Sequence, residues 1–248
     1  LRGDYRDTEK FVLESRYRRN WLESAMTKSP QSESVENFLK AVYTLQKGEE
    51  RVSTNTLRDV LNITAPSVTD MAQRLVALEL VDYQKYQGVL LTPKGVKIAL
   101  NVIRRHRLIE LYLVRELGYE LHEVHAEAEA LEHAVSEHFI DAIARKLGDP
   151  GFDPHGDPIP TAEGLMIPVR NLMPLSALEM GDTATVAQLK TSDPDMLQHI
   201  LDRGFTLDSP LEIVAIDPFD GPITARINGE NRLIGHQVAD YILVQKTA

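Results

Sequence analysis

A run of three glycines and four prolines between Gly148 and Pro160 limits most strongly how this chain can fold. Glycine and proline at that density cannot continue a helix, so the run marks a domain boundary. Before it, apolar residues recur every three or four positions, which predicts helices. After about Leu175, short apolar runs separated by turn residues predict strands. We therefore expect a multi-domain, mainly α protein with a small C-terminal β-barrel.

Residues 34–98 have the order helix, helix, turn, helix and β-hairpin. Apolar spacing predicts helices over 35–46, 55–61 and 66–78, and strands over 81–85 and 89–92. Ser34 and Thr64 are the expected N-caps of the first and third helices. This order is typical of a winged helix-turn-helix, whose second motif helix enters the DNA major groove. An unrelated small α+β domain is the alternative.

The charge distribution favours nucleic-acid binding in the same region. The chain as a whole has a formal net charge of −10. Residues 51–110 nevertheless contain nine Lys and Arg against five Asp and Glu. A basic segment in an otherwise acidic protein is typical of a DNA-binding domain.

Two long neighbouring helices are expected next, over 92–117 and 122–147, each followed by a glycine. Their broad apolar faces suggest a dimerisation domain, and packing within one chain is the alternative. On a continuous helix, His125, Glu129, Glu132 and His133 would form one stripe beside the apolar face. On the preceding helix, His106 and Glu110 have the i, i+4 spacing that brings two side chains over one surface patch.

These His and Glu residues have the spacing of metal ligands. The chain has no cysteine, so disulfides, thiolate zinc sites and iron–sulfur clusters are excluded. Imidazole and carboxylate ligands suit Mn²⁺, Fe²⁺, Mg²⁺ or Zn²⁺. A solvated helix flank is the alternative interpretation. His122, His138 and His155 have no equivalent partners in the pattern and are interpreted as structural or solvent-facing.

Several signatures, in this order along the chain, resemble the diphtheria toxin repressor / manganese transport regulator family over residues 34–160. They lie at residues 34–43, 64–69, 104–110, 124–133 and 156–160. The C-terminal 75 residues resemble the SH3-like (FeoA-like) domain of the longer members. Residues 1–33 are charged and polar with no clear apolar face, and they are expected to be an N-terminal extension, helical or disordered. The resemblance implies a DNA-binding domain at 34–98 and a metal-binding and dimerisation domain at 99–160. It further implies a linker at 161–174 and the SH3-like domain at 175–248.

The resemblance also implies two metal sites. The family's primary site corresponds to Glu129, Glu132 and His133, with a fourth ligand at the position of Asn37. Its ancillary site corresponds to His106, Glu110 and His125. The C-terminal domain is expected to add a ligand, for which Asp193 is the candidate. A helix N-cap is the competing role for Asp193.

Substitutions within these patterns favour manganese. Manganese-responsive members commonly carry Glu at the position of Glu129, where iron-responsive members carry Cys. Lys40 stands where some small manganese regulators have a ligand Glu, so a close binuclear site is not expected. Glu36 is an acidic neighbour of Asn37, but its register matches a non-ligand position. Mn²⁺ is thus the expected co-repressor, with Fe²⁺ as the alternative and with Zn²⁺, Co²⁺ or Cd²⁺ able to substitute in vitro.

The implied function is metal-dependent repression of metal-uptake genes. A homodimer is expected to bind a pseudo-palindromic double-stranded operator in the cytoplasm, with no membrane association and no enzymatic activity. The residues expected to contact DNA are Thr64, Pro66, Ser67, Thr69, Arg74, Lys85 and Gln87. The alternatives are a metal-independent winged-helix regulator, a di-metal carboxylate enzyme and a metal buffer.

Overall fold

The computed structural model describes residues 32–166 and 170–247. The prediction for the extension at 1–33 therefore lies almost entirely outside the described residues. The chain divides into two compact units. One unit runs to Arg105 and includes Ala130–Asp149, and the other comprises His106–Glu129 and Pro150–Ala248.

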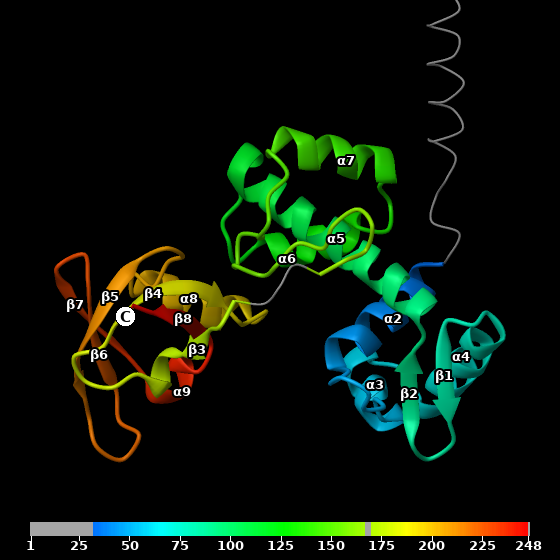
Figure 1. Cartoon of the computed structure of the whole chain (residues 1–248), viewed down its shortest axis with the longest axis horizontal. Helices are drawn as coiled ribbons and strands as arrows, with labels where there is room; N and C mark the ends of the chain where they lie inside the picture. The colour runs from blue at the N-terminus through cyan, green and yellow to red at the C-terminus, as the bar shows by residue number, and fades with distance from the viewer. Residues whose placement is uncertain (1–31, 167–169, 248) are drawn as a thin grey trace, which may run out of the picture. The chain divides into compact units, whose positions relative to one another are not determined.

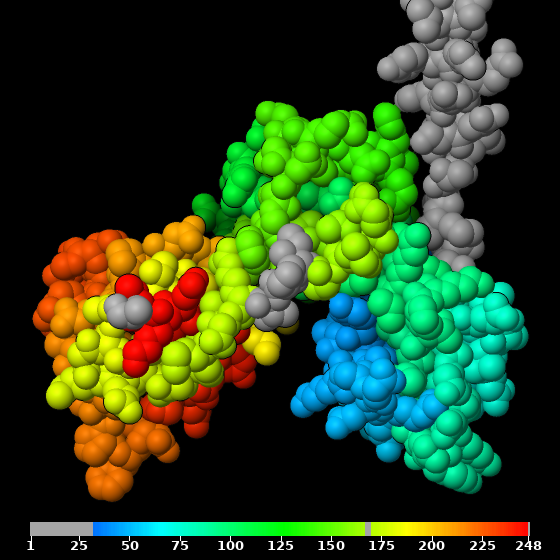
Figure 2. Space-filling view, viewed as in Figure 1, coloured from blue at the N-terminus to red at the C-terminus, as the bar shows by residue number. Residues whose placement is uncertain are grey.

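The first unit contains a helical domain with a β-hairpin (Figure 1), which confirms the winged helix-turn-helix order. Its elements are α2 (Glu33–Leu45), α3 (Thr54–Leu61), α4 (Ala65–Ala77), β1 (Val81–Gln84) and β2 (Gly88–Leu91). The two strands pair antiparallel, with Val81 opposite Leu91. The tip of this hairpin projects into solvent (Figures 1 and 2), and residues 84–87 are exposed.

One of the two predicted helix N-caps agrees with the structure and the other does not. Thr64 caps α4 as predicted, because its Oγ1 accepts from the Ser67 backbone N–H at 3.3 Å. The prediction that Ser34 caps the first helix is wrong, since α2 begins at Glu33 and its N-cap is Ser32. Ser34 lies inside the first turn, where its backbone is already helical.

The domain is held together by an apolar core from all three helices and the hairpin. Phe38, Leu39, Leu57 and Leu75 have at most 1% of their surface exposed. The hairpin also requires a glycine, because a Cβ built at Gly88 would lie 2.2 Å from the Val52 carbonyl oxygen. This close approach lets Val52 and Val89 exchange backbone hydrogen bonds of 2.8 and 2.9 Å. The wing is thereby anchored to the core.

The long helices differ from the prediction in one important respect. α5 (Pro93–Leu117) agrees with the predicted helix over 92–117. The predicted helix over 122–147 is instead two helices, α6 (Val124–Leu131) and α7 (Glu137–Lys146). The chain turns over residues 132–135, and Ser136 has extended backbone and accepts from the Phe139 N–H to start α7. The side-chain cap at Ser136 starts a new helix at a point where the apolar periodicity of the sequence continues.

The C-terminal part of the second unit is an antiparallel sheet with a separate core. Its strand order is β3-β8-β4-β5-β6-β7. The strands are β3 (Met173–Pro174), β4 (Thr183–Leu189), β5 (Pro210–Ile216), β6 (Ile223–Ile227), β7 (Glu230–Ile234) and β8 (Ile242–Lys246). The helical segments are η1 (Leu175–Ala177), α8 (Pro194–Asp202) and α9 (His236–Ala239). The apolar runs of the sequence predict strands over 184–189, 211–217, 223–227 and 241–244 and a helix over 194–203, which correspond to β4, β5, β6, β8 and α8. They predict neither β3 nor β7.

In the parts of the chain that the structure describes, no helix combines the length and apolar character required to cross a membrane.

Candidate metal centres and nucleic-acid interface

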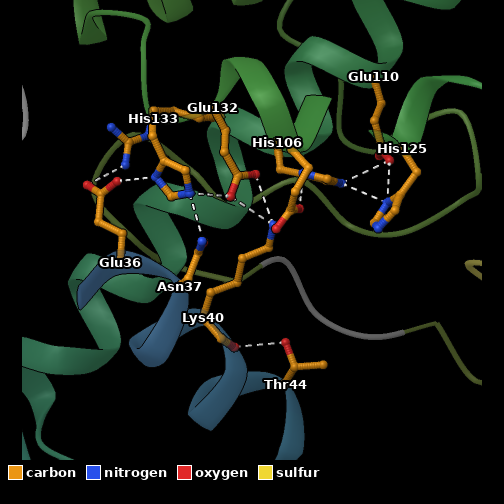
Figure 3. Close-up of polar contacts among 11 residues, drawn as sticks. Glu36, Asn37, Lys40, Thr44, His106, Glu110, His125, Glu132 and His133 are labelled. Atoms are coloured by element: carbon orange, nitrogen blue, oxygen red, sulfur yellow. Dashed lines mark hydrogen bonds and ion pairs between the residues drawn. The ribbon is translucent and has the colours of Figure 1, made fainter. Parts of the chain in front are cut away.

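Glu110 is the buried centre of a His and Glu cluster in the second unit, whose outer member His125 is exposed. It lies on α5, four residues after His106, and only 2% of its surface is exposed. Its Oε1 lies 2.9 Å from His106 Nε2 and 3.3 Å from His125 Nδ1, which α6 supplies (Figure 3). The two imidazole nitrogens are 3.2 Å apart. The structure thus brings together the three residues predicted for the ancillary site.

His155 joins this cluster, although the sequence pattern gave it no partner. Its Nε2 lies 3.8 Å from Glu110 Oε1, and the residue is 8% exposed. Its other ring nitrogen, Nδ1, is buried without a hydrogen-bond partner. The sequence signal that could have found it is its place in the Gly/Pro-rich turn at 148–160, beside Gly156.

The turn that carries His155 is fixed by contacts within the second unit. The Leu189 N–H of β4 donates to the His155 carbonyl at 2.9 Å. Gly156 has a φ of +89°, and a Cβ there would lie 2.2 Å from the Ala187 carbonyl oxygen. Asp153 Oδ1 accepts from the backbone N–H groups of His155 and Asp157, both at 2.9 Å. The imidazole is therefore held at Glu110 by the C-terminal sheet.

The electrostatics of the cluster suit a cation. Burial acts to raise the pKa of Glu110, but hydrogen bonds with His106 and His125 outweigh burial and hold that pKa well below its usual range. Burial lowers the pKa of His155, which favours the neutral imidazole that metals bind. Burial, with Asp157 and Glu110 nearby, raises the pKa of Asp153 to about 8, while Arg107 acts in the opposite direction.

The ligand atoms also have the separation that one ion requires. Ligands at about 2.1 Å from a metal lie about 3.0 to 3.4 Å apart at octahedral or tetrahedral angles. The nitrogen and oxygen atoms of His106, Glu110 and His125 are 2.9 to 3.3 Å apart. In addition, His106 Nδ1 lies 3.5 Å from Glu129 Oε2, a carboxylate placed to orient this imidazole. The residues therefore fit a divalent metal.

A second cluster lies in the first unit, where the turn after α6 meets α2 (Figure 3). His133 Nε2 is 2.7 Å from Asn37 Oδ1 and 3.2 Å from Glu132 Oε1. Glu132 is fully buried. One imidazole nitrogen thus faces two oxygen donors at the same point. The helical spacing used to predict them does not apply, because Glu132 and His133 follow the end of α6.

Three charged residues surround this second cluster. Lys40 Nζ lies 2.9 Å from both carboxylate oxygens of Glu132. Glu36 Oε2 lies 2.5 Å from His133 Nδ1, and Glu36 Oε1 accepts from Arg105 Nη2 at 2.7 Å. Sequence patterns identified neither the role of Glu36 nor that of Arg105. Their contacts join residues 69 to 97 positions apart, which no local spacing reveals.

Asp193 has the competing role that the sequence allowed. Its Oδ1 accepts from the backbone N–H groups of Asp195 and Met196, both at 3.0 Å, as the N-cap of α8. Within the described residues, the group of acidic and His side chains around His106 and Glu110 includes His125 but not Asp193. Asp193 as a ligand stays a prediction.

The residues predicted to contact DNA lie on one helix and on the wing. Thr64, Pro66, Ser67 and Arg74 are exposed at or along α4, and Thr69 is partly exposed. Lys85 and Gln87 are exposed at the hairpin tip. The Thr69 hydroxyl donates to the Ala65 carbonyl at 3.2 Å, so its free lone pairs and its methyl group remain available to DNA.

Comparison with known proteins identifies all three parts of the chain. Residues 31–89 match the N-terminal DNA-binding domain of iron-dependent repressors, and residues 92–161 match their metal-binding and dimerisation domain. Residues 173–246 match the FeoA domain. The fold expected from the sequence, with a DNA-binding domain, a helical dimerisation domain and an SH3-like domain, is thus confirmed.

Individual relatives agree with this assignment. The regulator MntR of Bacillus pumilus is 38% identical over 112 residues, which cover 44% of this chain and 76% of that protein. The iron-dependent repressor IdeR of Mycobacterium tuberculosis is 27% identical, over 86% of this chain and 97% of its own. A manganese-dependent transcriptional repressor solved with manganese is 40% identical, with a TM-score of 0.78 over 86% of this chain and 100% of its own. The chain belongs to the diphtheria toxin repressor / manganese transport regulator family of metal-dependent, DNA-binding transcriptional repressors.

Proposed function

We propose that this protein is a transcriptional repressor that binds operator DNA when it holds Mn²⁺, with Fe²⁺ as the alternative metal. One observation carries the proposal: Asn37 Oδ1 lies 2.7 Å from His133 Nε2, although the residues are 96 positions apart. Asn37 belongs to the first helix of the DNA-binding domain. Donors from that domain and from the turn after α6 therefore meet at one point.

The proposed ligands of the primary metal are Glu129, Glu132 and His133, with Asn37 in the fourth position. Glu129 is included on the family resemblance, since its carboxylate lies 3.5 Å from His106 of the ancillary cluster. A divalent cation bound there would supply positive charge to oxygen donors from both α2 and the turn, and would thereby hold these two segments together. The set contains no thiolate, which favours Mn²⁺ over softer metals by ligand type. The similarity to a manganese-dependent repressor supports the same choice.

His106, Glu110, His125 and His155 are the proposed ligands of a second metal. His155 links this cluster to the C-terminal sheet, because β4 holds its backbone. Metal at this cluster would therefore stabilise the turn at 150–160 against α5. We expect this second ion to strengthen the repressor state, while the primary cluster acts directly on α2.

The energy that such a switch needs is moderate. Changing the ratio of two conformations from 1:99 to 99:1 requires about 5.5 kcal/mol of differential binding. Structural zinc sites in zinc-finger peptides contribute about 10–16 kcal/mol, and a more weakly bound Mn²⁺ ion needs to supply only about half of that or less. The ordered form of a homodimer would present two α4 helices to a pseudo-palindromic operator.

The regulated genes are proposed to encode metal uptake, as the family resemblance implies, and the protein to act in the cytoplasm, where the DNA lies. We propose no enzymatic activity. A di-metal carboxylate enzyme draws its ligands from four helices of one bundle. Here the primary ligands come from α2, α6 and a turn, and the ancillary ligands come from α5, α6 and a loop.

The test is selection of binding sites from a random double-stranded DNA library, with Mn²⁺ or with chelator. Anisotropy titrations of the selected DNA follow, with Mn²⁺, anaerobic Fe²⁺ and Zn²⁺. We expect a pseudo-palindromic sequence that binds at least a hundredfold more tightly with Mn²⁺. The Glu132→Ala, His133→Ala variant should lose this dependence, and the exposed His138→Ala should keep it.

Each alternative predicts a different result. Equal DNA binding with chelator and with Mn²⁺ would make the protein a metal-independent regulator. Stoichiometric metal uptake without DNA selection would make it a metal buffer. Turnover of an oxidase or hydrolase substrate by the metal-loaded protein would favour the enzyme.

A further inference from the structure

Glu36 is a buried carboxylate whose two oxygens have different partners. Only 2% of its surface is exposed, and it lies on the side of α2 that faces the turn carrying His133 (Figure 3). Oε1 accepts from Arg105 Nη2 at 2.7 Å, and Oε2 lies 2.5 Å from His133 Nδ1. The Arg105 side chain is itself only 3% exposed, and its Nη1 is 3.5 Å from Glu137 Oε1. Arg105 thus holds Glu36 in place.

The burial of Glu36 and Arg105 is not explained by a gain in folding stability. A buried ion pair gains little stability over apolar side chains of similar volume, because desolvation offsets the attraction. Glu36 also sits among apolar α2 residues that already form the core of the DNA-binding domain. Its geometry toward His133 therefore calls for an explanation other than stability.

The contact fixes which ring nitrogen of His133 is available. A proton on Nδ1 is donated to Glu36, and this leaves the lone pair of Nε2 pointing away from Glu36. Nε2 is the atom that lies 2.7 Å from Asn37 Oδ1 and 3.2 Å from Glu132 Oε1. Glu36 therefore directs the metal-binding nitrogen of His133 toward the other donors. A carboxylate on the far nitrogen also increases the basicity of a ligand imidazole.

We propose that Glu36, held by Arg105, is the residue that positions His133 for metal binding and is not itself a ligand. This inference rests on the proposed function, because it requires a metal at Glu132, His133 and Asn37. It also assigns Glu36 a role in signalling. Since Glu36 is on α2, the same contact that orients the ligand ties the DNA-binding domain to the metal-binding turn.

The experiment compares Glu36→Leu and Glu36→Gln in a His125→Ala background, where Mn²⁺ binding to the ancillary cluster is weakened and the primary site dominates the titration. Leucine removes the acceptor, whereas glutamine keeps an amide oxygen for the Nδ1 proton. Glu33→Gln is the matched control, because Glu33 is an exposed residue one turn earlier on α2. The measurements are Mn²⁺ affinity by calorimetry, the visible spectrum of the Co²⁺-loaded protein, and the Tm of each metal-free protein.

We expect Glu36→Leu to weaken Mn²⁺ binding by about 10- to 100-fold, the usual effect of losing such a partner. Its Co²⁺ spectrum should change, because the His133 nitrogen is no longer directed. Glu36→Gln should bind more tightly than Glu36→Leu, and Glu33→Gln should equal the parent. The metal-free Tm values show whether each variant is folded at the temperature of the titration.

Mn²⁺ affinity of Glu36→Leu within about threefold of the parent would overturn the inference. So would weaker binding with an unchanged Co²⁺ spectrum, which would indicate a purely structural role. If Glu36→Leu does not fold, Glu36→Gln decides alone. Mn²⁺ affinity and a Co²⁺ spectrum equal to those of the parent support an acceptor role, and loss of Mn²⁺ binding by a folded Glu36→Gln overturns it. Failure of the parent protein itself to bind Mn²⁺ would instead overturn the proposed function.

Discussion

Lys40 Nζ lies 2.9 Å from each of the two carboxylate oxygens of Glu132, a residue 92 positions later in the chain. Glu132 is fully buried, and 19% of the Lys40 side chain is exposed. Lys40 is on α2, so the ammonium group links the DNA-binding domain to a proposed metal ligand. It supplies positive charge where a metal at Glu132 would also supply it.

We therefore expect Lys40 to compete with the metal for Glu132. Lys40→Met should raise Mn²⁺ affinity by about tenfold, which corresponds to about 1.4 kcal/mol. The same change should lower the unfolding free energy of the metal-free protein by about 2 kcal/mol, since it removes the ammonium partner of a buried carboxylate. Calorimetric titration with Mn²⁺ and chemical denaturation in chelator measure the two effects.

Lys47→Met is the control for this substitution, because Lys47 is exposed just after α2. It should change neither quantity. The two effects of Lys40→Met have opposite signs, which general damage to the fold cannot produce. A weaker affinity for Mn²⁺ in Lys40→Met would show that Lys40 supports the metal site and does not compete with it.

His155 should be a ligand of the ancillary metal and of that metal alone. Its Nε2 approaches Glu110 Oε1 at 3.8 Å within the buried cluster. His155→Ala should weaken the second Mn²⁺ binding event by about 10- to 100-fold and leave the first unchanged. Competition titration against a chelating dye resolves the two events. His138→Ala should bind both ions normally, and loss of the first event in His155→Ala would contradict separate sites.

The fold was largely predictable because its signals are local. Thr64 caps α4, the wing needs Gly88, and α8 starts at the Asp193 cap, each readable within a few residues. The short strand β3 could not be predicted, because its two residues pair only with a strand about 70 positions later. β7 escaped prediction because its polar, exposed residues show little apolar alternation.

The sequence indicated which residues form the candidate sites better than it indicated how these residues are arranged. The i, i+4 spacing of His106 and Glu110 correctly brought them together, because α5 is a continuous helix. The longer spacing to Glu132 and His133 assumed a helix that in fact ends at Leu131. Residues such as Glu36 and His155 reach their clusters only through tertiary packing, and no local period encodes such contacts.

The ancillary cluster should make stability depend on pH in the metal-free protein. The pKa of Glu110 is held below its usual value by His106 and His125. A carboxylate whose pKa falls on folding stabilises the protein at pH values above its unfolded pKa, and this contribution is lost as pH falls through the folded pKa. Glu110→Gln should therefore lower Tm near neutral pH, and the difference from the wild type should shrink below about pH 4.5.

Thermal unfolding in chelator, at pH values from about 3 to 7, measures this difference. Asp182→Asn is the comparison, since the pKa of this partly exposed carboxyl outside the cluster is also lowered, chiefly by its hydrogen bond with Lys246. A constant Tm difference between Glu110→Gln and the wild type over the whole range would show that Glu110 contributes through packing and not through its charge.

The last prediction concerns the DNA interface. Arg74 is exposed on α4 and is expected to contact phosphate, which carries no sequence information. Arg74→Ala should weaken binding about equally for matched and mismatched operators, and it should reduce the slope of log affinity against log salt by about 1. Ser67→Ala, at the exposed start of the same helix, should instead reduce discrimination between operators and leave the salt slope unchanged. Lys190→Ala, an exposed control in the C-terminal domain, should change neither quantity. Anisotropy titrations at three or more salt concentrations with Mn²⁺ present separate these effects, and an unchanged slope in Arg74→Ala would remove Arg74 from the interface.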